Sequence, residues 1–217
     1  MHEPILALEG ALDTFSVALM RDGEIEAESL AKQAALEGGL ALVRARLDAG
    51  KLRLGDLGGI AVGTGPGGFT GLRITIAFAK SLAFAAKLPL AGVSSFDILE
   101  AGANTQSRLP RVTVVYGRPG VACMRRTDGA GTRTACGPVA STLARLTSEG
   151  EEIAIIAATE DVRSAALERG LSVLLIPAGT ELPAATLARI ARMRTPAASV
   201  HEVAPDYGEL PAARIRT

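Results

Sequence analysis

A glycine-rich segment in the first half of the chain is the part of the sequence best suited to hold a ligand. It reads GTGPGGFTGLR at 63–73, follows the apolar run 59–62 and leads into a long apolar segment, 72–86. This order is typical of a strand, a tight turn and a helix N-terminus, where glycines expose backbone N–H groups and the helix dipole favours an anion. The candidate nucleotide or anion site consists of Glu9, Gly65, Gly67, Gly68 and Thr70.

Two interpretations of this segment stay open at the level of sequence. The glycines either bind an anion or only make a tight, closely packed turn. The spacing matches neither the phosphate loop that ends in Gly-Lys-Ser/Thr nor the dinucleotide fingerprint Gly-x-Gly-x-x-Gly followed by an acid.

The remaining reactive side chains are few. Glu9 and Asp13 could form an acidic pair or be polar turn residues, while His2 and His201 lie at opposite ends of the chain. Neither a paired-histidine metal site nor a Ser–His–acid arrangement is therefore supported. We expect no catalytic residue, no metal and no cofactor.

Three segments together resemble one family. GTGPGGFTGLRITIAFAKSLA at 63–83, ILALE at 5–9 followed by SVAL at 16–19, and LAGVSS at 90–95 are similar to the TsaB (YeaZ) family, over about residues 4–100. The chain departs from the usual family pattern where Gly68 replaces Ser and where Glu9-Gly10 replaces Asp-Thr.

The resemblance implies the two-lobed fold of actin, Hsp70 and sugar kinases, which is ribonuclease H-like. It also implies a non-catalytic subunit of the bacterial complex that makes threonylcarbamoyladenosine in tRNA. Such a subunit binds and stabilises a TsaD-type threonylcarbamoyltransferase, is joined by a TsaE-type ATPase, and meets tRNA only through the complex. In this fold an Asp orients the nucleotide, and Glu9 occupies the resembling position without the usual neighbouring hydroxyl. In the second lobe, family members often have an Asp-Ala-Arg-like element that opens a hairpin. Residues 116–120 stand in that region and contain no acid, which indicates a degraded nucleotide site.

The pattern of apolar residues predicts an α/β chain of two similar lobes, 1–102 and a smaller, divergent 103–217, whose last residues pack back on the first lobe. The predicted strands are 4–9, 15–20, 25–30, 59–63, 90–93, 111–116, 121–125, 153–158 and 171–176. The predicted helices are 32–48, 72–86, 96–103, 139–148, 162–169 and 182–193.

Helices 32–48 and 72–86 are the predicted partner surface. The second is apolar almost all round, so more than its own sheet should cover it. Each glycine inside the first helix lowers helix stability by about 1 kcal/mol relative to alanine. Close approach of a partner backbone would explain why glycines stand there. Pattern alone equally allows an internal helix pair; in the TsaB family these helices pack against TsaD. The predicted interface residues are Leu36, Gly39, Leu40, Val43, Leu47, Ile76, Ala79, Lys80 and Ala83. In isolation the chain is expected to form a homodimer through the same surface.

Bulk composition narrows the function classes. Lys+Arg and Asp+Glu are equal at 23 each, so no net charge attracts RNA or membrane. Lys80 and Lys87 interrupt the most apolar segment, and no stretch is expected to span a bilayer. Cys123 and Cys136 do not form a C-x-x-C pair, which favours reduced thiols and a cytoplasmic protein.

Three functions stand as alternatives to the TsaB-like subunit. They are an actin-fold small-molecule kinase or ATPase, a metallopeptidase, and a purely homodimeric structural protein.

Overall fold

The first lobe is built on a mixed five-stranded sheet. The computed structural model describes residues 1–31, 34–118 and 120–208. Three antiparallel strands come first along the chain, and two parallel strands then extend the sheet in the order β3-β2-β1-β4-β5. The strands are β1 (Ile5–Glu9), β2 (Thr14–Arg21), β3 (Glu24–Ala31), β4 (Gly59–Gly63) and β5 (Leu90–Val93).

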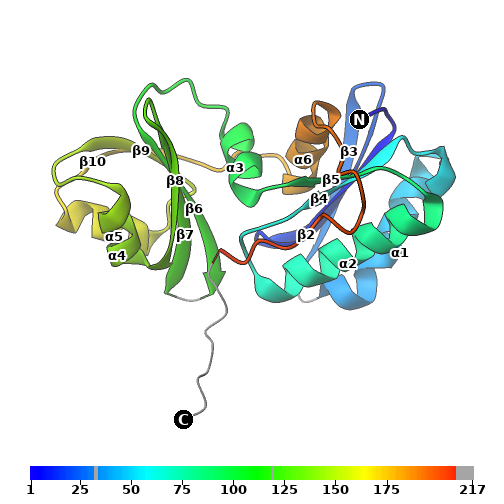
Figure 1. The fold of residues 1–217 in the computed structure, drawn as a ribbon, viewed down its shortest axis with the longest axis horizontal. Coiled ribbons are helices and arrows are strands. Elements are labelled where there is room, and N and C mark those ends of the chain that lie inside the picture. The colour runs from blue at the N-terminus through cyan, green and yellow to red at the C-terminus, as the bar shows by residue number, and fades with distance from the viewer. Residues whose placement is uncertain (32–33, 119, 209–217) are drawn as a thin grey trace, which may run out of the picture.

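The second lobe repeats this arrangement. Its sheet has the order β10-β9-β6-β7-β8, again three antiparallel strands followed by two parallel ones. The prediction of an α/β fold with two similar mixed sheets is confirmed (Figure 1). The strands are β6 (Arg111–Arg118), β7 (Val121–Asp128), β8 (Gly131–Pro138), β9 (Glu152–Ile156) and β10 (Ser172–Ile176).

Helices cover the sheets and join the lobes. The start of the predicted helix 32–48 includes residues 32–33, which lie outside the described residues; the helix itself begins at Ala35. Ser94 accepts a hydrogen bond from the Asp97 N–H and caps the helix that lies between the lobes, as its sequence predicts. The helices are α1 (Ala35–Ala49), α2 (Phe69–Ala86), α3 (Ser95–Ala103), α4 (Val139–Leu146), α5 (Glu160–Glu168) and α6 (Pro183–Arg192).

The chain returns to the first lobe after β10. The apolar face of α6 packs on one face of the first sheet, where Leu187 and Ala188 meet Ile5 and Ala7. Residues 197–208, which we name the strap, then run along the sheet edge, and the Ala197 N–H donates to the Leu90 carbonyl. Figure 1 shows the strap in orange to red, passing from β5 toward the second lobe. The strap therefore covers the edge strand of the first sheet.

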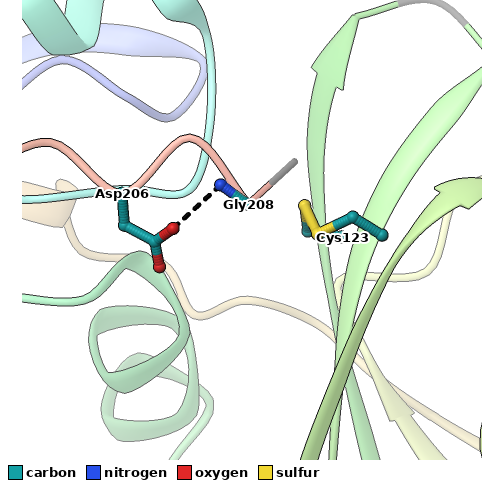
Figure 2. Close-up of a disulfide and its surroundings, with 4 residues drawn as sticks. Cys123, Asp206 and Gly208 are labelled. Atoms are coloured by element: carbon teal, nitrogen blue, oxygen red, sulfur yellow. Dashed lines mark hydrogen bonds between the residues drawn. A yellow bond between two sulfur atoms is a disulfide. The ribbon is translucent and has the colours of Figure 1, made fainter. Parts of the chain in front are cut away.

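The two cysteines correct a sequence-based expectation. Cys123 and Cys136 form a disulfide instead of remaining reduced. The reason is their register, because they lie directly opposite each other on the antiparallel strands β7 and β8, with 4.1 Å between their Cα atoms. Figure 2 shows the bond next to the end of the strap.

Helix α2 is longer than the sequence predicts. Among the described residues it is the one helix long and apolar enough, by length and composition, to cross a membrane. It reaches this length because it begins at Phe69 rather than at residue 72. A third of it is buried, and Leu72, Ile76 and Ala79 pack into the core under the first sheet.

Candidate functional site

The glycine-rich segment links β4 to α2 and is pinned at several points. The Thr64 N–H donates to the Val93 carbonyl, the Ser95 N–H to the Gly65 carbonyl and the Gly68 N–H to the Ala11 carbonyl. The last of these bonds, at 2.7 Å, ties the segment to the turn between β1 and β2. We refer to residues 64–68 as the glycine loop.

Two glycines of this loop have neighbours that exclude a side chain. A Cβ on Gly67, whose φ is +155°, would lie 2.3 Å from the Ala11 carbonyl oxygen. A Cβ on Gly65, whose φ is +91°, would lie 2.4 Å from the Asp206 carbonyl oxygen in the strap. The glycines thus permit close packing on both sides of the loop, while Thr70 lies exposed in the first turn of α2.

Glu9 is fully buried at the end of β1. Its Oε1 accepts hydrogen bonds from the N–H groups of Ala11, at 2.7 Å, and Leu12, at 3.2 Å. The carboxylate therefore stabilises the β1–β2 turn on which the glycine loop rests. Asp13, its possible acidic partner, lies at the other end of that turn on the wall of a cleft.

A cleft of about 380 Å³ separates the lobes. Its second-lobe wall carries the Tyr116 hydroxyl, which hydrogen-bonds with Thr159 and Asp161. Burial and the bond to Asp161 raise the pKa of Tyr116 to about 12, so the phenol is neutral at physiological pH. The cleft lining includes Leu12, Thr14, Leu99, Val115, Glu181 and Thr186.

No sequence signal identified the Tyr116 cluster. Tyr116 lies more than forty residues before Thr159 and Asp161, and the pairing of β6 with β9 brings it close to them. The surrounding segment 116–120 includes residue 119, which lies outside the described residues. Within the described part of the chain, no group of three His, Cys, Asp or Glu residues could hold a metal ion.

The predicted partner helices α1 and α2 lie side by side on the first lobe. The residues that they expose, however, are mostly not the predicted interface residues. Leu36 and Leu40 are exposed on α1. The small residues Ala77, Ser81 and Ala85 are exposed on α2 and recur every four residues. Lys80 is only partly exposed, and its ammonium donates to the His201 carbonyl of the strap.

Most of the other predicted interface residues are inside the chain's own core. The reason is that the sheet and the neighbouring helix take up the faces expected to meet a partner. A Cβ on Gly39 would lie 2.8 Å from the Phe78 ring, so its close approach is to α2 of the same chain. The buried residues are Gly39, Val43, Leu47, Ile76, Ala79 and Ala83.

An open groove of about 420 Å³ remains between α1, α2 and the short 3₁₀ helix Leu54–Asp56. Its floor is apolar, and Arg44, Asp48 and Arg53 stand along its margin. We call the groove, together with Leu36 and the exposed residues of α2, the α1–α2 face. The apolar lining residues are Leu40, Val43, Leu47, Leu52, Leu54 and Leu82.

Comparison with known proteins connects this geometry to a family. Residues 29–206 match the family model described as TsaD, tRNA N6-adenosine threonylcarbamoyltransferase. The tRNA threonylcarbamoyladenosine biosynthesis protein TsaB of Escherichia coli K12 is 38% identical over 109 residues, which are 50% of this chain and 47% of that protein. The chain thus spans about half the length of the curated relatives it matches.

Solved structures resemble the whole fold. A Pseudomonas aeruginosa protein described as similar to peptidase YeaZ superposes with a TM-score of 0.74 at 22% identity, covering 96% of this chain and 100% of its own. A Bacteroides thetaiotaomicron protein described as having an actin-like ATPase fold and unknown function gives a TM-score of 0.52 at 9% identity, covering 87% and 95%. At these identities the likeness establishes the fold, which is actin-like.

Proposed function

Because this chain belongs to the TsaB/YeaZ family, we propose that it acts in the biosynthesis of tRNA threonylcarbamoyladenosine as a non-catalytic subunit in the cytoplasm. Its proposed partner is a TsaD-type threonylcarbamoyltransferase, and a TsaE-type ATPase joins the pair. The tRNA is bound only through the complex, which agrees with the absence of net charge on this chain.

The α1–α2 face is the observation that carries this proposal. Leu40, which lines the groove, is 48% exposed, and Leu36, one helical turn earlier on α1, is 67% exposed. Apolar surface gathered in this way and rimmed by charge is typical of a protein–protein interface. In the absence of the partner, we propose that the same face holds two copies of this chain together.

The first-lobe turn supports a non-catalytic role. The Glu9 carboxylate is occupied by the turn's own N–H groups. A side chain at Gly10 would meet the Thr75 Oγ1 at 2.1 Å, so the hydroxyl usual in the family at this position has no space here. At these two positions the turn therefore lacks the Asp-Thr pair with which the family fold orients a phosphate and its metal.

Leu40→Arg tests the proposed interface. Burying an unpaired guanidinium in the groove should weaken binding of a TsaD-type partner by about 2 kcal/mol, roughly thirtyfold. Leu174→Arg is the matched control, because Leu174 is also 48% exposed but lies on β10 of the other lobe. Titration calorimetry with the partner measures both variants. Equal affinities for Leu40→Arg and the unmodified chain would place the interface elsewhere.

The interlobe cleft favours the second candidate, a small-molecule kinase or ATPase, since its volume would admit a small ligand. We expect the purified chain neither to hydrolyse ATP with multiple turnovers nor to transfer a threonylcarbamoyl group. The assay uses the chain alone and then with its partner. Turnover by the isolated chain that Glu9→Gln abolishes, in a variant shown to be folded, would establish the second candidate instead.

A further inference from the structure

The end of the strap lies between the glycine loop of the first lobe and the disulfide of the second. The Asp206 N–H donates to the Thr64 carbonyl at 2.7 Å. The Gly208 N–H donates to Asp206 Oδ1 at 2.8 Å, which turns Gly208 toward Cys123 (Figure 2). Between them, the Tyr207 ring lies 5.2 Å from the ring of Phe69, the first residue of α2. The strap therefore covers part of the glycine loop and contacts Phe69, which stays 55% exposed.

Gly208 lies beside both sulfur atoms. A Cβ at this position would lie 2.2 Å from Cys123 Sγ and 2.8 Å from Cys136 Sγ. On its other side, the same Cβ would be 3.2 Å from the Cβ of Pro66 in the glycine loop. The space that a side chain at Gly208 would need is thus filled by the disulfide and by the loop.

Breaking the disulfide would change the space at this contact. Two bonded sulfurs lie closer together than two thiols, which require a van der Waals separation of about 3.5–4 Å. Strands β7 and β8 pair at eight positions and hold the two α-carbons in place after the bond breaks. The sulfurs must then separate by side-chain rotation, and Gly208 lies directly against both of them.

We propose that Cys123–Cys136 is a redox latch for the strap. A dithiol reductant attacks the sulfur of Cys136, which is partly exposed on the edge strand β8. The S–S bond of the protein breaks while a disulfide forms in the reductant. Two electrons and two protons pass to the cysteines. The separated thiols displace Gly208, and residues 206–208 leave the glycine loop.

The consequence is controlled access to the glycine loop. Oxidised protein keeps the glycine loop covered, and reduced protein exposes it. In the cytoplasm disulfides are usually transient and redox-sensing, which fits a latch better than a permanent brace. Only this compartment argument rests on the proposed function, and the test below needs neither the partner nor tRNA.

Hydrogen exchange of the purified full chain tests the latch, with free thiols counted by mass spectrometry before and after dithiothreitol. The amides of Asp206 and Gly208 should exchange about tenfold faster after reduction. The Ala197 amide, bonded to Leu90 at the far end of the strap, should keep its protection as an internal control. Unchanged exchange at 206–208, or a disulfide that dithiothreitol does not reduce in the folded chain, would overturn the proposal.

Two variants separate the latch from general destabilisation. Cys123→Ser with Cys136→Ser has no S–S bond to break, so its exchange at 206–208 should not respond to dithiothreitol. Gly208→Ala should release the strap even with the disulfide formed, because its methyl group collides with both sulfurs. Gly150→Ala is the matched control, since Gly150 has φ +68° against +70° for Gly208 but no atom near its missing side chain. Equal exchange at 206–208 in the two glycine variants would also reject the latch.

Discussion

Gly67 illustrates at the residue scale why the glycine loop has its composition. Its φ of +155° and the Ala11 carbonyl beside it both exclude a side chain. The neighbouring Gly68 N–H is bonded to that same carbonyl. These contacts support the interpretation of the loop as a tight turn. Anion binding by Gly65, Gly67, Gly68 and Thr70 stays a prediction.

Gly67→Ala should lower the free energy of unfolding by about 2–4 kcal/mol, because the methyl group must displace the β1–β2 turn. Gly131→Ala is the control, since Gly131 also has a positive φ, +119°, but open space around it. Urea unfolding followed by circular dichroism measures both. If the loop instead serves an anion alone, Gly67→Ala will lose phosphate binding at unchanged stability.

At the scale of elements, Arg126 ties three parts of the second lobe together. From β7 its guanidinium donates to both carboxylate oxygens of Glu151, to Asp128 and to the carbonyl of Leu146 at the end of α4. The side chain is 9% exposed and Glu151 21%. Hydrogen bonds from Arg126 hold the pKa of Glu151 and that of Asp128 below their usual values.

Arg126→Met should destabilise the chain by about 2 kcal/mol at neutral pH, because it leaves the Glu151 carboxylate unpaired. Since the folded pKa is depressed, the stabilisation is complete above the unfolded value of about 4.3 and is lost as the pH falls through the folded value. The difference between variant and unmodified chain should therefore shrink below about pH 4. Urea unfolding across that pH range checks this, and a difference independent of pH would contradict it.

At the scale of the whole molecule, the lobes are joined by α3 and by the returning C-terminal segment. Arg125 of β7 reaches across to Asp97 and Glu100 of α3 and stacks over the Phe96 ring. Arg194, between α6 and the strap, pairs with the same Asp97 at 2.6 Å. The relative position of the lobes thus depends on a partly buried charge cluster.

Arg125→Met should weaken the contact between the lobes by about 2 kcal/mol and separate a single thermal transition into two. The reason is that Glu100 loses its guanidinium partner, although Asp97 keeps Arg194. Arg163→Met removes the exposed Arg163–Glu160 pair and should change stability by less than about 0.5 kcal/mol. Differential scanning calorimetry distinguishes the cases; one unchanged transition in Arg125→Met would show that α3 packing alone joins the lobes.

The sequence alone determined most of the elements and their order, because local patterns specify them, but β8 (Gly131–Pro138) has no predicted counterpart. Alternating apolar residues located the strands, Ser94 marked the start of α3, and the Asp22-Gly23 turn, with φ of +53° and +83°, joined β2 to β3. The repeated strand and helix order predicted two similar lobes. The family resemblance was visible in short contiguous motifs, and the observed fold agrees with that family.

Tertiary structure alone decided which faces those elements bury. Helix α2 is apolar around most of its circumference, so its periodicity could not show that Ala79 and Ala83 face the sheet while Ala77 and Ser81 face solvent. The neighbours of Gly39 and the pairing of Cys123 with Cys136 depend on strand register and helix packing over long sequence separations. Such contacts leave no local periodic pattern, and only the folded chain brings them together.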